Sequence, residues 1–116
     1  MKTAGYTDCM LKIDVHSHIL PPEWPNLAEK YDDPRFPVMV NADGRHRIYK
    51  DRAFFREIWE NGYDPEFRIE ECQRLGVDVQ VISTVPVMFS YWARPEHAHE
   101  LHRYLNQHTA EICRRF

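Results

Sequence analysis

The sequence predicts an α/β fold built from parallel strands and crossover helices. Three features predict it: an apolar run at 12–19, a well-capped helix over 64–76, and a valine- and isoleucine-rich run over 77–85 that follows this helix directly. A shorter helix over 23–31, which ends at Asp-Asp-Pro, and a final helix from Pro95 complete the pattern. Strands that alternate with helices indicate parallel pairing, because a parallel pair needs a crossover connection.

Length and composition fit one modest globular domain. The chain has 116 residues, of which 43% are hydrophobic and 28% charged, with a net charge of −3 and a pI of about 6.1. These values are typical of a soluble protein and provide no basic surface for nucleic acid. No apolar run approaches the length of a membrane span.

The N-terminal residues and the cysteines bear on the compartment. Residues 1–9 lack the hydrophobic segment of a signal peptide, so we expect an unstructured leader there and a cytoplasmic location. The three cysteines, Cys9, Cys72 and Cys113, are scattered and odd in number. This pattern favours free thiols in a reducing compartment over a disulfide framework.

Residues 12–19, with the sequence KIDVHSHI, form the first expected strand, which ends in two histidines one residue apart. Alternate side chains on a strand point to one face, so His16 and His18 should lie side by side, about 7 Å apart along the strand. Two such imidazoles can bind one divalent metal, zinc by preference, with Asp14 supporting them from the same face. The spacing also fits two solvated or core histidines, and a metal site would need further ligands.

The next region changes to three short alternating runs. The Asp43-Gly44 pair is a hairpin turn signal, and a second turn near Lys50 leads to a third run over 53–58. We therefore expect an antiparallel three-stranded insertion over 38–58. A sheet of this size is too small to fold alone and must pack on a larger body.

The third of these runs carries a cation on a largely apolar face. Regular alternation would place Phe54, Arg56 and Ile58 on one face, and Phe55 and Glu57 on the other. An arginine in such a position meets a carboxylate, either from a neighbouring residue in a structural ion pair or from a ligand. The sequence leaves both possibilities open.

The helix over 64–76 has clear signals at both ends. Asp64 is a suitable N-cap residue, Pro65 suits the first helical position, and Gly76 provides the C-terminal stop. The strand that follows, 77–85, has the continuous apolar composition of a strand covered on both faces.

An aromatic loop, VMFSYW at 87–92, precedes the last helix. That helix carries an apolar stripe of Ala98, Leu101, Leu105 and Ile112. Its histidines lack an acidic partner at the spacing of helical zinc motifs, so we expect a solvated surface. They are His97, His99, His102 and His108, and His46 beside the hairpin turn is expected to be solvated as well.

The order of elements brings two of these features to one place. Catalytic groups in parallel α/β folds gather at the carboxyl ends of the strands. His16 and His18 lie at that end of the first strand, and the residues over 86–92 lie at that end of the second. We therefore expect both to line one mouth, which favours a metal site.

Three stretches carry a resemblance to a known family: KIDVHSHILPPEWP at 12–25, DPEFRI at 64–69 and STVPVMFSYWARPE at 83–96. The paired histidines mark the amidohydrolase superfamily generally, whereas STVPVMFSYW is far more specific. On these stretches the chain resembles the 2-amino-3-carboxymuconate-6-semialdehyde decarboxylases, which are zinc enzymes of that superfamily. The resemblance covers nearly all of the chain beyond residues 1–9.

The resemblance implies a (β/α)8 TIM barrel and a metal-dependent, non-oxidative decarboxylation in tryptophan breakdown by the kynurenine route, which limits quinolinate formation. It implies Zn²⁺ as cofactor, with His16 and His18 as the first two ligands. It implies that Arg56 binds a substrate carboxylate and that Lys50 lines the same pocket. The implied partners are the unsaturated amino dicarboxylate semialdehyde and a second copy in a homodimer.

The chain departs from this family in extent. It contains two of eight strand–helix units and the insertion, whereas such barrels typically need about 250 residues. We therefore interpret residues 10–116 as the N-terminal part of an incomplete barrel, a fragment or truncated isoform, with no catalytic acid or base among them. Two parallel strands leave unpaired edges and uncovered apolar faces, so we expect the chain to be inactive alone.

Two other functions stay open. One is another metal-dependent decarboxylase or hydrolase of the superfamily that acts on a different unsaturated or aromatic acid, although the run at 83–92 argues against it. The other is a non-catalytic truncated protein that binds the full-length enzyme. Assays against benzoate-type acids would test the first, and co-purification with the complete enzyme would test the second.

Overall fold

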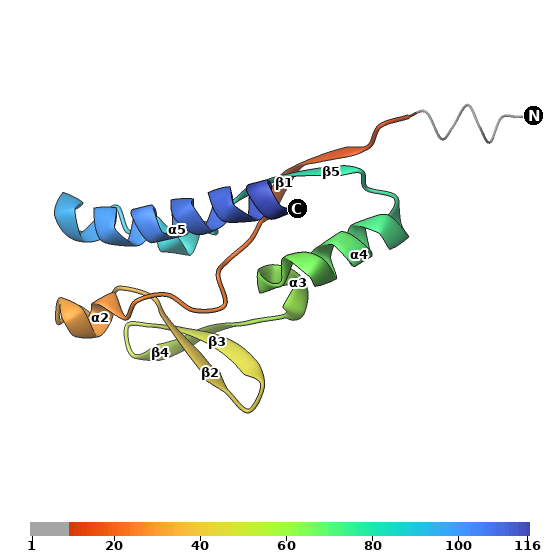
Figure 1. The fold of residues 1–116 in the computed structure, drawn as a ribbon. Coiled ribbons are helices and arrows are strands. Elements are labelled where there is room, and N and C mark those ends of the chain that lie inside the picture. The colour runs from red at the N-terminus through yellow and green to blue at the C-terminus, as the bar shows by residue number, and fades with distance from the viewer. Residues whose placement is uncertain (1–9) are drawn as a thin grey trace, which may run out of the picture.

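The computed structural model describes residues 10–116 and shows a mixed α/β fold with two small sheets (Figure 1). The predicted leader at 1–9 lies outside the described residues. A parallel pair joins β1 (Ile13–His18) to β5 (Val79–Ser83), and a separate antiparallel sheet has the order β2-β3-β4. The predicted α/β class with parallel and antiparallel parts is confirmed, while closure into a barrel stays a prediction.

The β1–β5 pair is held in a parallel register from Ile13 opposite Val79 to His18 opposite Ser83. The register shifts once, between Asp14 and Ser17. The second strand is shorter than the predicted run over 77–85, because the amide of Val77 still bonds to a carbonyl of the preceding helix.

Both strands of this pair leave apolar side chains uncovered, as two isolated parallel strands should. Val15 is 75% exposed, Val81 52% and Val79 43%. The composition of the second strand is that of a doubly covered strand, and among residues 10–116 its valines do not receive that cover.

Two helices lie between β4 (Ala53–Ile58) and β5. The short α3 (Glu60–Tyr63) leads into α4 (Pro65–Leu75). The Asp64 carboxylate accepts hydrogen bonds from the first-turn amides of α4, and Gly76 ends the helix with a φ of +77°. Both predicted end signals are confirmed, and α4 has no buried residue.

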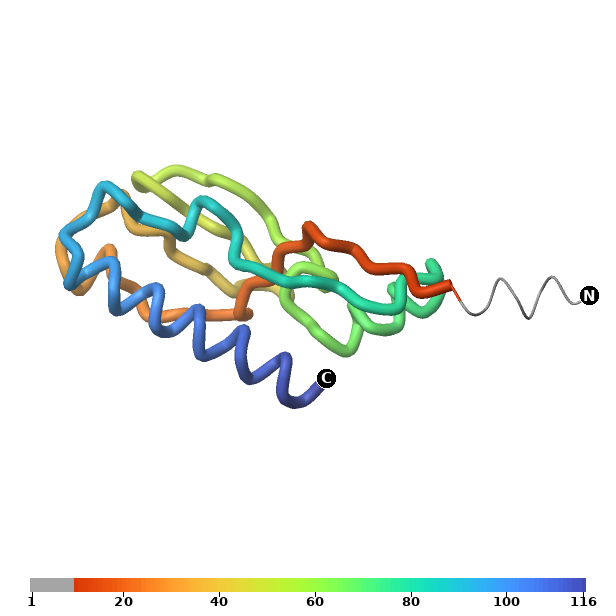
Figure 2. The backbone as a smooth tube through the Cα atoms, turned by 90° about the horizontal axis from the view of Figure 1, so that it is seen from above, coloured from red at the N-terminus to blue at the C-terminus, as the bar shows by residue number. Residues whose placement is uncertain are grey.

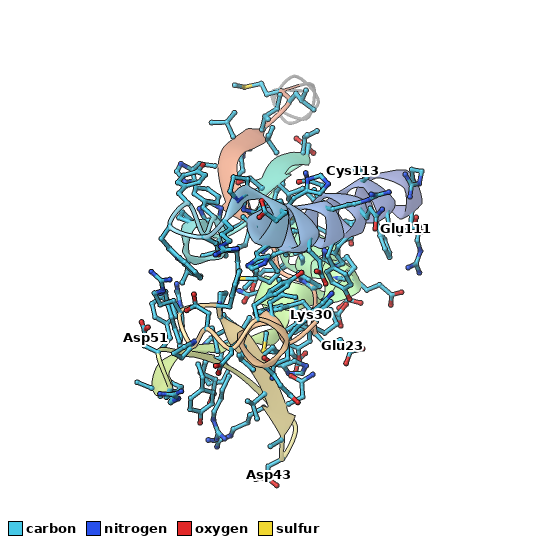
Figure 3. All side chains as sticks on the ribbon, turned by 90° about the vertical axis from the view of Figure 1, so that its left-hand side faces the viewer. Glu23, Lys30, Asp43, Asp51, Glu111 and Cys113 are labelled. Atoms are coloured by element: carbon cyan, nitrogen blue, oxygen red, sulfur yellow. The ribbon has the colours of Figure 1, made fainter. Side chains whose placement is uncertain are left out.

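The insertion forms the antiparallel sheet of β2 (Val38–Ala42), β3 (Arg45–Lys50) and β4 (Ala53–Ile58). Each two-residue turn has positive φ at both positions, Asp43 and Gly44 in the first, Asp51 and Arg52 in the second, which is the backbone of tight hairpins. Asp43 projects from the tip of the first hairpin (Figure 3).

One predicted alternation in this sheet is wrong. The β3–β4 register advances by two residues on β4, so Arg56 faces Ile48 and Phe54 faces Tyr49. Since Ile48 and Tyr49 point to opposite sides of β3, Phe54 and Arg56 do not share a face. The irregularity at Phe55 is the physical reason.

The core lies between the insertion and the last helix. Figures 1 and 2 show α2 (Leu27–Lys30) and the N-terminal half of α5 (Pro95–Arg115) at the same end of the molecule, with η1 (Pro86–Met88) nearby. Their buried side chains form one cluster with those of β3 and of the segments on either side of α2. Its members are Leu20, Trp24, Leu27, Phe36, Ile48, Met88, Leu101 and Leu105. The insertion therefore packs on a larger body, as expected.

Within residues 10–116, no helix has both the length and the apolar character that crossing a membrane requires.

Candidate metal and substrate site

His16 and His18 lie together at the carboxyl end of β1. Their ring centroids are 5.1 Å apart and the ring planes are nearly perpendicular, at 82°. The predicted side-by-side placement of the two rings is confirmed despite the register shift in β1. His16 is exposed and His18 is half-buried, so a ligand at the strand end can reach both rings.

The ring of His18 is oriented by the neighbouring strand. Its Nδ1 lies 3.1 Å from the hydroxyl oxygen of Ser83, the residue paired with it in β5. That hydroxyl also lies 3.5 Å from the carbonyl of Ser17, to which it can donate. In the tautomer that carries the proton on Nδ1, the Ser83 oxygen accepts it and the lone pair of Nε2 is available for a metal.

Asp14 supports the pair through the backbone and not through the rings. Its carboxylate accepts the backbone amide of His16 at 3.1 Å and the side-chain amide of Gln80 at 3.1 Å. The predicted support therefore acts on the path of the strand. The register shift of β1 lies at this point, and Asp14 stabilises it.

An arginine of α4 also holds the strand end. The guanidinium of Arg68 donates to the Ser17 hydroxyl at 2.8 Å, to the His18 carbonyl at 2.5 Å, and twice to the Asn61 carbonyl at 2.7 and 2.9 Å. Burial lowers the pKa of this guanidinium, and the carboxylates of Glu71 and Asp14 oppose that shift.

Sequence reasoning gave no role to Arg68 or Ser83. Both lie in the stretches that carried the family resemblance, 64–69 and 83–96. Their positions in these stretches were the available signal. Their contacts depend on chain segments that lie 50 or more residues away in sequence, which local patterns do not reveal.

Two imidazoles fit a zinc ion as two of the four donors of a tetrahedral site. Among the described residues, no group of three or more histidine, cysteine, aspartate or glutamate side chains is placed to hold a metal ion. His16 and His18 could therefore fill two positions of a tetrahedral site, and metal binding by this pair stays a prediction. The identity of the metal stays a prediction.

Arg56 is exposed on β4. Among residues 10–116 its guanidinium has no hydrogen bond or ion pair, so the structural ion pair that the sequence left open is not formed there. The carboxylate of Glu57 turns instead to β3, where it meets Arg47 at 3.3 Å and Arg45 at 3.9 Å. The guanidinium of Arg56 is free to meet an external anion.

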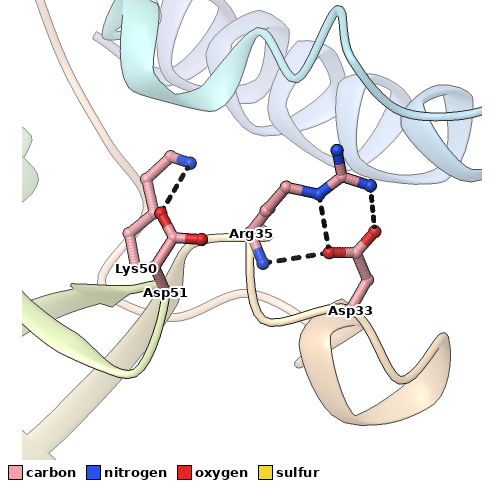
Figure 4. Close-up of polar contacts among 4 residues, drawn as sticks. All are labelled: Asp33, Arg35, Lys50 and Asp51. Atoms are coloured by element: carbon pink, nitrogen blue, oxygen red, sulfur yellow. Dashed lines mark hydrogen bonds and ion pairs between the residues drawn. The ribbon is translucent and has the colours of Figure 1, made fainter.

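Lys50 lies beside the aromatic loop. Its ammonium is 5.7 Å from the ring centroid of Trp92. It also lies 3.4 Å from a carboxylate oxygen of Asp51 (Figure 4). Arg35 covers the same indole at 4.4 Å. Two cations therefore flank Trp92 in the loop that follows β5.

Arg35 is itself neutralised by a carboxylate. It binds Asp33 through two side-chain hydrogen bonds of 2.8 and 3.0 Å, and these hold the pKa of the Asp33 carboxyl below its usual value (Figure 4).

The structure does not join the two predicted parts of the site. Within the described part of the chain, no hydrogen bond, ion pair or ring contact links Arg56 or Lys50 to His16 or His18. Arg56 and Lys50 belong to the antiparallel sheet, which is set apart from β1 and β5 (Figure 1). The predicted common pocket stays a prediction.

The expectation that the other histidines are solvated is wrong for four of the five. His97 stacks on Tyr31 with centroids 3.7 Å apart, and His46 stacks on Tyr63 at 4.0 Å. His102 contacts the carbonyl of Phe89 through Nε2. Burial lowers the pKa of the half-buried His108, and only His99 is exposed. For the three histidines of α5 the reason is that this helix packs along several segments instead of presenting one broad free face, whereas His46 lies on β3 and meets α3.

Known proteins provide an independent comparison. No protein-family profile matches the chain. The chain is 50% identical over 106 residues to the 2-amino-3-carboxymuconate-6-semialdehyde decarboxylase of Dictyostelium discoideum, a match that covers 88% of this chain and 29% of the relative. It is 42% identical over 106 residues to the protein of the same name from Caenorhabditis elegans, covering 90% and 26%.

A third relative of that name, from Sus scrofa, is 37% identical over 51 residues, which are 43% of this chain and 37% of the relative. The resemblance predicted from the sequence is confirmed. The chain spans about 29% and 26% of the length of the first two relatives.

Proposed function

We propose, on the premise that this chain is homologous to part of the 2-amino-3-carboxymuconate-6-semialdehyde decarboxylases, that it forms part of the active site of such an enzyme. One observation carries the proposal: the adjacent imidazoles of His16 and His18 at the carboxyl end of a parallel strand. The sequence identity to a relative of that name, 50% over 106 residues, supports the choice of reaction. The reaction is a non-oxidative loss of carbon dioxide in tryptophan breakdown.

His16 and His18 would hold Zn²⁺, with further donors from outside the described residues. Zinc, when bound, lowers the pKa of a water ligand to near neutrality and polarises oxygen atoms of the substrate. His18 is prepared for this role because Ser83 engages its Nδ1 and leaves Nε2 available. The hydrogen bond of Asp14 to the His16 amide fixes the backbone between the two ligands.

Arg56 would bind a substrate carboxylate. Its guanidinium has no partner among the described residues, and its planar fork matches a carboxylate through two parallel hydrogen bonds. Lys50 would add a positive charge at the aromatic loop near Trp92. Together they suit an unsaturated amino dicarboxylate, in which one carboxylate is held while the other is lost.

The remaining assignments follow from the same kinship. The substrate is a small molecule, the assembled enzyme is a homodimer, the fold of residues 10–116 is the first part of a (β/α)8 barrel, and the location is cytoplasmic. We also propose that the 116-residue polypeptide alone has negligible activity, because the described residues provide two metal donors and no group of three.

A chimera tests the proposal. Residues 10–116 replace the stretch that they match in the Dictyostelium discoideum decarboxylase, which is 50% identical. The zinc-loaded chimera should decarboxylate the semialdehyde. H16A and H18A should each lower kcat/KM by about 10²-fold or more and reduce bound zinc, because a metal ligand is lost.

Matched controls separate the site from the fold. H99A removes an exposed histidine of α5, and R52K alters an exposed arginine of the second hairpin turn, so both should leave kcat/KM unchanged. R56K should raise KM, since an ammonium cannot replace the bidentate fork. A folded chimera that stays active with both histidines replaced, or that prefers benzoate-type acids, would contradict the proposal.

A further inference from the structure

We propose that Arg68 is a positioning residue that fixes the carboxyl end of β1 and, through it, the ring of His18. The inference rests on the proposed function, because the orientation of His18 matters only if its ring binds a metal. It gives a role to the stretch DPEFRI at 64–69, which contains none of the proposed metal-binding or substrate-binding residues. Arg68 itself makes no contact with metal or substrate in this assignment.

The contacts of Arg68 join three separate segments. Its Nη1 donates to the Ser17 hydroxyl at 2.8 Å, and its Nη2 donates to the His18 carbonyl at 2.5 Å. Its Nε and Nη2 donate to the carbonyl of Asn61 in α3 at 2.9 and 2.7 Å. The planar fork thus connects α4, α3 and the end of β1, and two of its acceptors belong to the histidine pair's own strand.

The chemistry of this arginine is unusual for a structural cation. Within residues 10–116 it is half-buried and forms no ion pair with a carboxylate; every hydrogen bond that it donates goes to a neutral oxygen. Burying a guanidinium without a paired anion costs free energy unless several hydrogen bonds offset it. These bonds are several and converge on neighbouring acceptors, which indicates that Arg68 controls the position of these acceptors.

Among residues 10–116, apolar packing covers little of this strand end. Val15 is 75% exposed and Ile13 is 50% exposed, so β1 has little apolar burial before Ile19. On one side β5 holds the strand through the amide of Ile19, which donates to the Ser83 carbonyl at 3.0 Å. On the other side Arg68 holds it through the His18 carbonyl. His18 is therefore fixed from two sides, and this places its Nδ1 at 3.1 Å from the Ser83 hydroxyl.

The same helix offers a matched control. Arg74 is exposed at 67% of its side chain, and its ion pair with Glu71, three residues before it, has a distance of 3.9 Å. It makes no hydrogen bond with β1 within the described residues. R74M therefore removes one positive charge from α4, as R68M does, without touching the strand.

The test measures the tautomer of His18 by ¹⁵N NMR of the metal-free 116-residue chain at pH 8. Wild type and R74M should show a single Nδ1–H tautomer for His18. R68M and R68K should show a mixture, because neither a thioether nor a single ammonium reproduces the fork. S83A should give the same mixture by removing the acceptor itself.

A calorimetric titration with Zn²⁺ alone provides the second readout. It uses the metal-depleted chimera, because the described residues supply two metal donors and no group of three. R68M and R68K should bind zinc about 10- to 100-fold more weakly than R74M, the range found when groups that orient metal ligands are removed. A purely structural role would lower the melting temperature of R68M and leave the His18 tautomer unchanged.

The outcomes are separable. A folded R68M that keeps one tautomer and the zinc affinity of R74M overturns the inference, as does a mixed tautomer in wild type. If circular dichroism shows that R68M is unfolded, R68K decides by the same criteria. If the chimera with the wild-type residues 10–116 binds no zinc, the metal assignment of the proposed function fails, and the NMR result alone decides the role of Arg68.

Discussion

The molecule divides into two regions that are stabilised in different ways. In the packed region, formed by the antiparallel sheet, α2, η1 and the N-terminal half of α5, Ile48 and Leu101 are each 1% exposed. In the open region, formed by β1, β5 and α4, Val15 is 75% and Leu75 68% exposed. The metal-binding candidates lie in the open region, whereas Lys50 lies in the packed one.

This contrast shows that a site can be ordered by hydrogen bonds where apolar burial is small. Burial contributes roughly 25 cal/mol per Å² of apolar surface removed from water, and the packed region has most of it. The open region has the β1–β5 backbone pairing, the Asp14 carboxylate and the Arg68 guanidinium instead. Hydrogen bonds are directional, so they fix the backbone of the strand end and the ring of His18 more closely than apolar contacts would.

The greatest change in stability is expected from a core substitution in the packed region, compared with a substitution of an exposed residue in the open region. L101A should lower the free energy of unfolding by about 2–5 kcal/mol, because it leaves a cavity in the core. V15A should change it by no more than about 0.5 kcal/mol, because that side chain is already in water. Urea denaturation of the two variants measures the difference. Equal costs would mean that the open region is covered in solution.

An intermediate loss of stability is expected from removing the N-cap of α4, the helix of the open region. D64A removes the carboxylate that accepts the Glu66 amide at 3.0 Å and the Phe67 amide at 3.4 Å. Because α4 has no buried residue, its stability depends on this cap, and we expect a loss of about 1 kcal/mol.

The cap of α2 gives the comparison for this variant. Asn26 accepts one amide, that of Glu29 at 3.0 Å, and α2 is anchored by the buried Leu27. N26A should therefore cost less than D64A in urea denaturation. The reverse order would show that α4 is held by contacts other than its cap.

A smaller change in stability is expected from a group of surface hydrogen bonds in the packed region. The hydroxyl of Tyr31 and the ammonium of Lys30, the latter at 2.9 Å, donate to Glu100 and hold the pKa of this carboxyl below its ordinary value. A lowered folded-state pKa stabilises the fold above the unfolded pKa, and the stabilisation is lost as the pH falls through the folded value.

E100Q should therefore lower the melting temperature at pH 7 by no more than about 3 °C, since exposed pairs contribute little. The difference from wild type should shrink as the pH falls through the lowered pKa of the folded-state Glu100 carboxyl, because protonation removes its charge. A thermal scan at each pH measures it. A difference that grows on acidification would contradict the assigned direction of the pKa shift.

Local sequence signals predicted most of the elements. The Asp64, Pro65 and Gly76 signals delimit α4 because caps depend on neighbouring residues alone. The hairpin of Asp43 and Gly44 is determined in the same way. The pairing of the His16 and His18 rings is also local, because two residues on one strand lie side by side wherever the strand packs.

The contacts between those elements were decided by the tertiary structure. The contacts of Arg68 with His18 and of Ser83 with the same histidine join residues at least 50 positions apart, and the stacking of His97 on Tyr31 joins another distant pair. The irregularity at Phe55, which moved Phe54 away from the face of Arg56, follows from strand pairing. Local sequence patterns therefore fixed which strand carries the two imidazoles. The orientation of the His18 ring was decided by the packing of distant segments, because it depends on partners that no local pattern specifies.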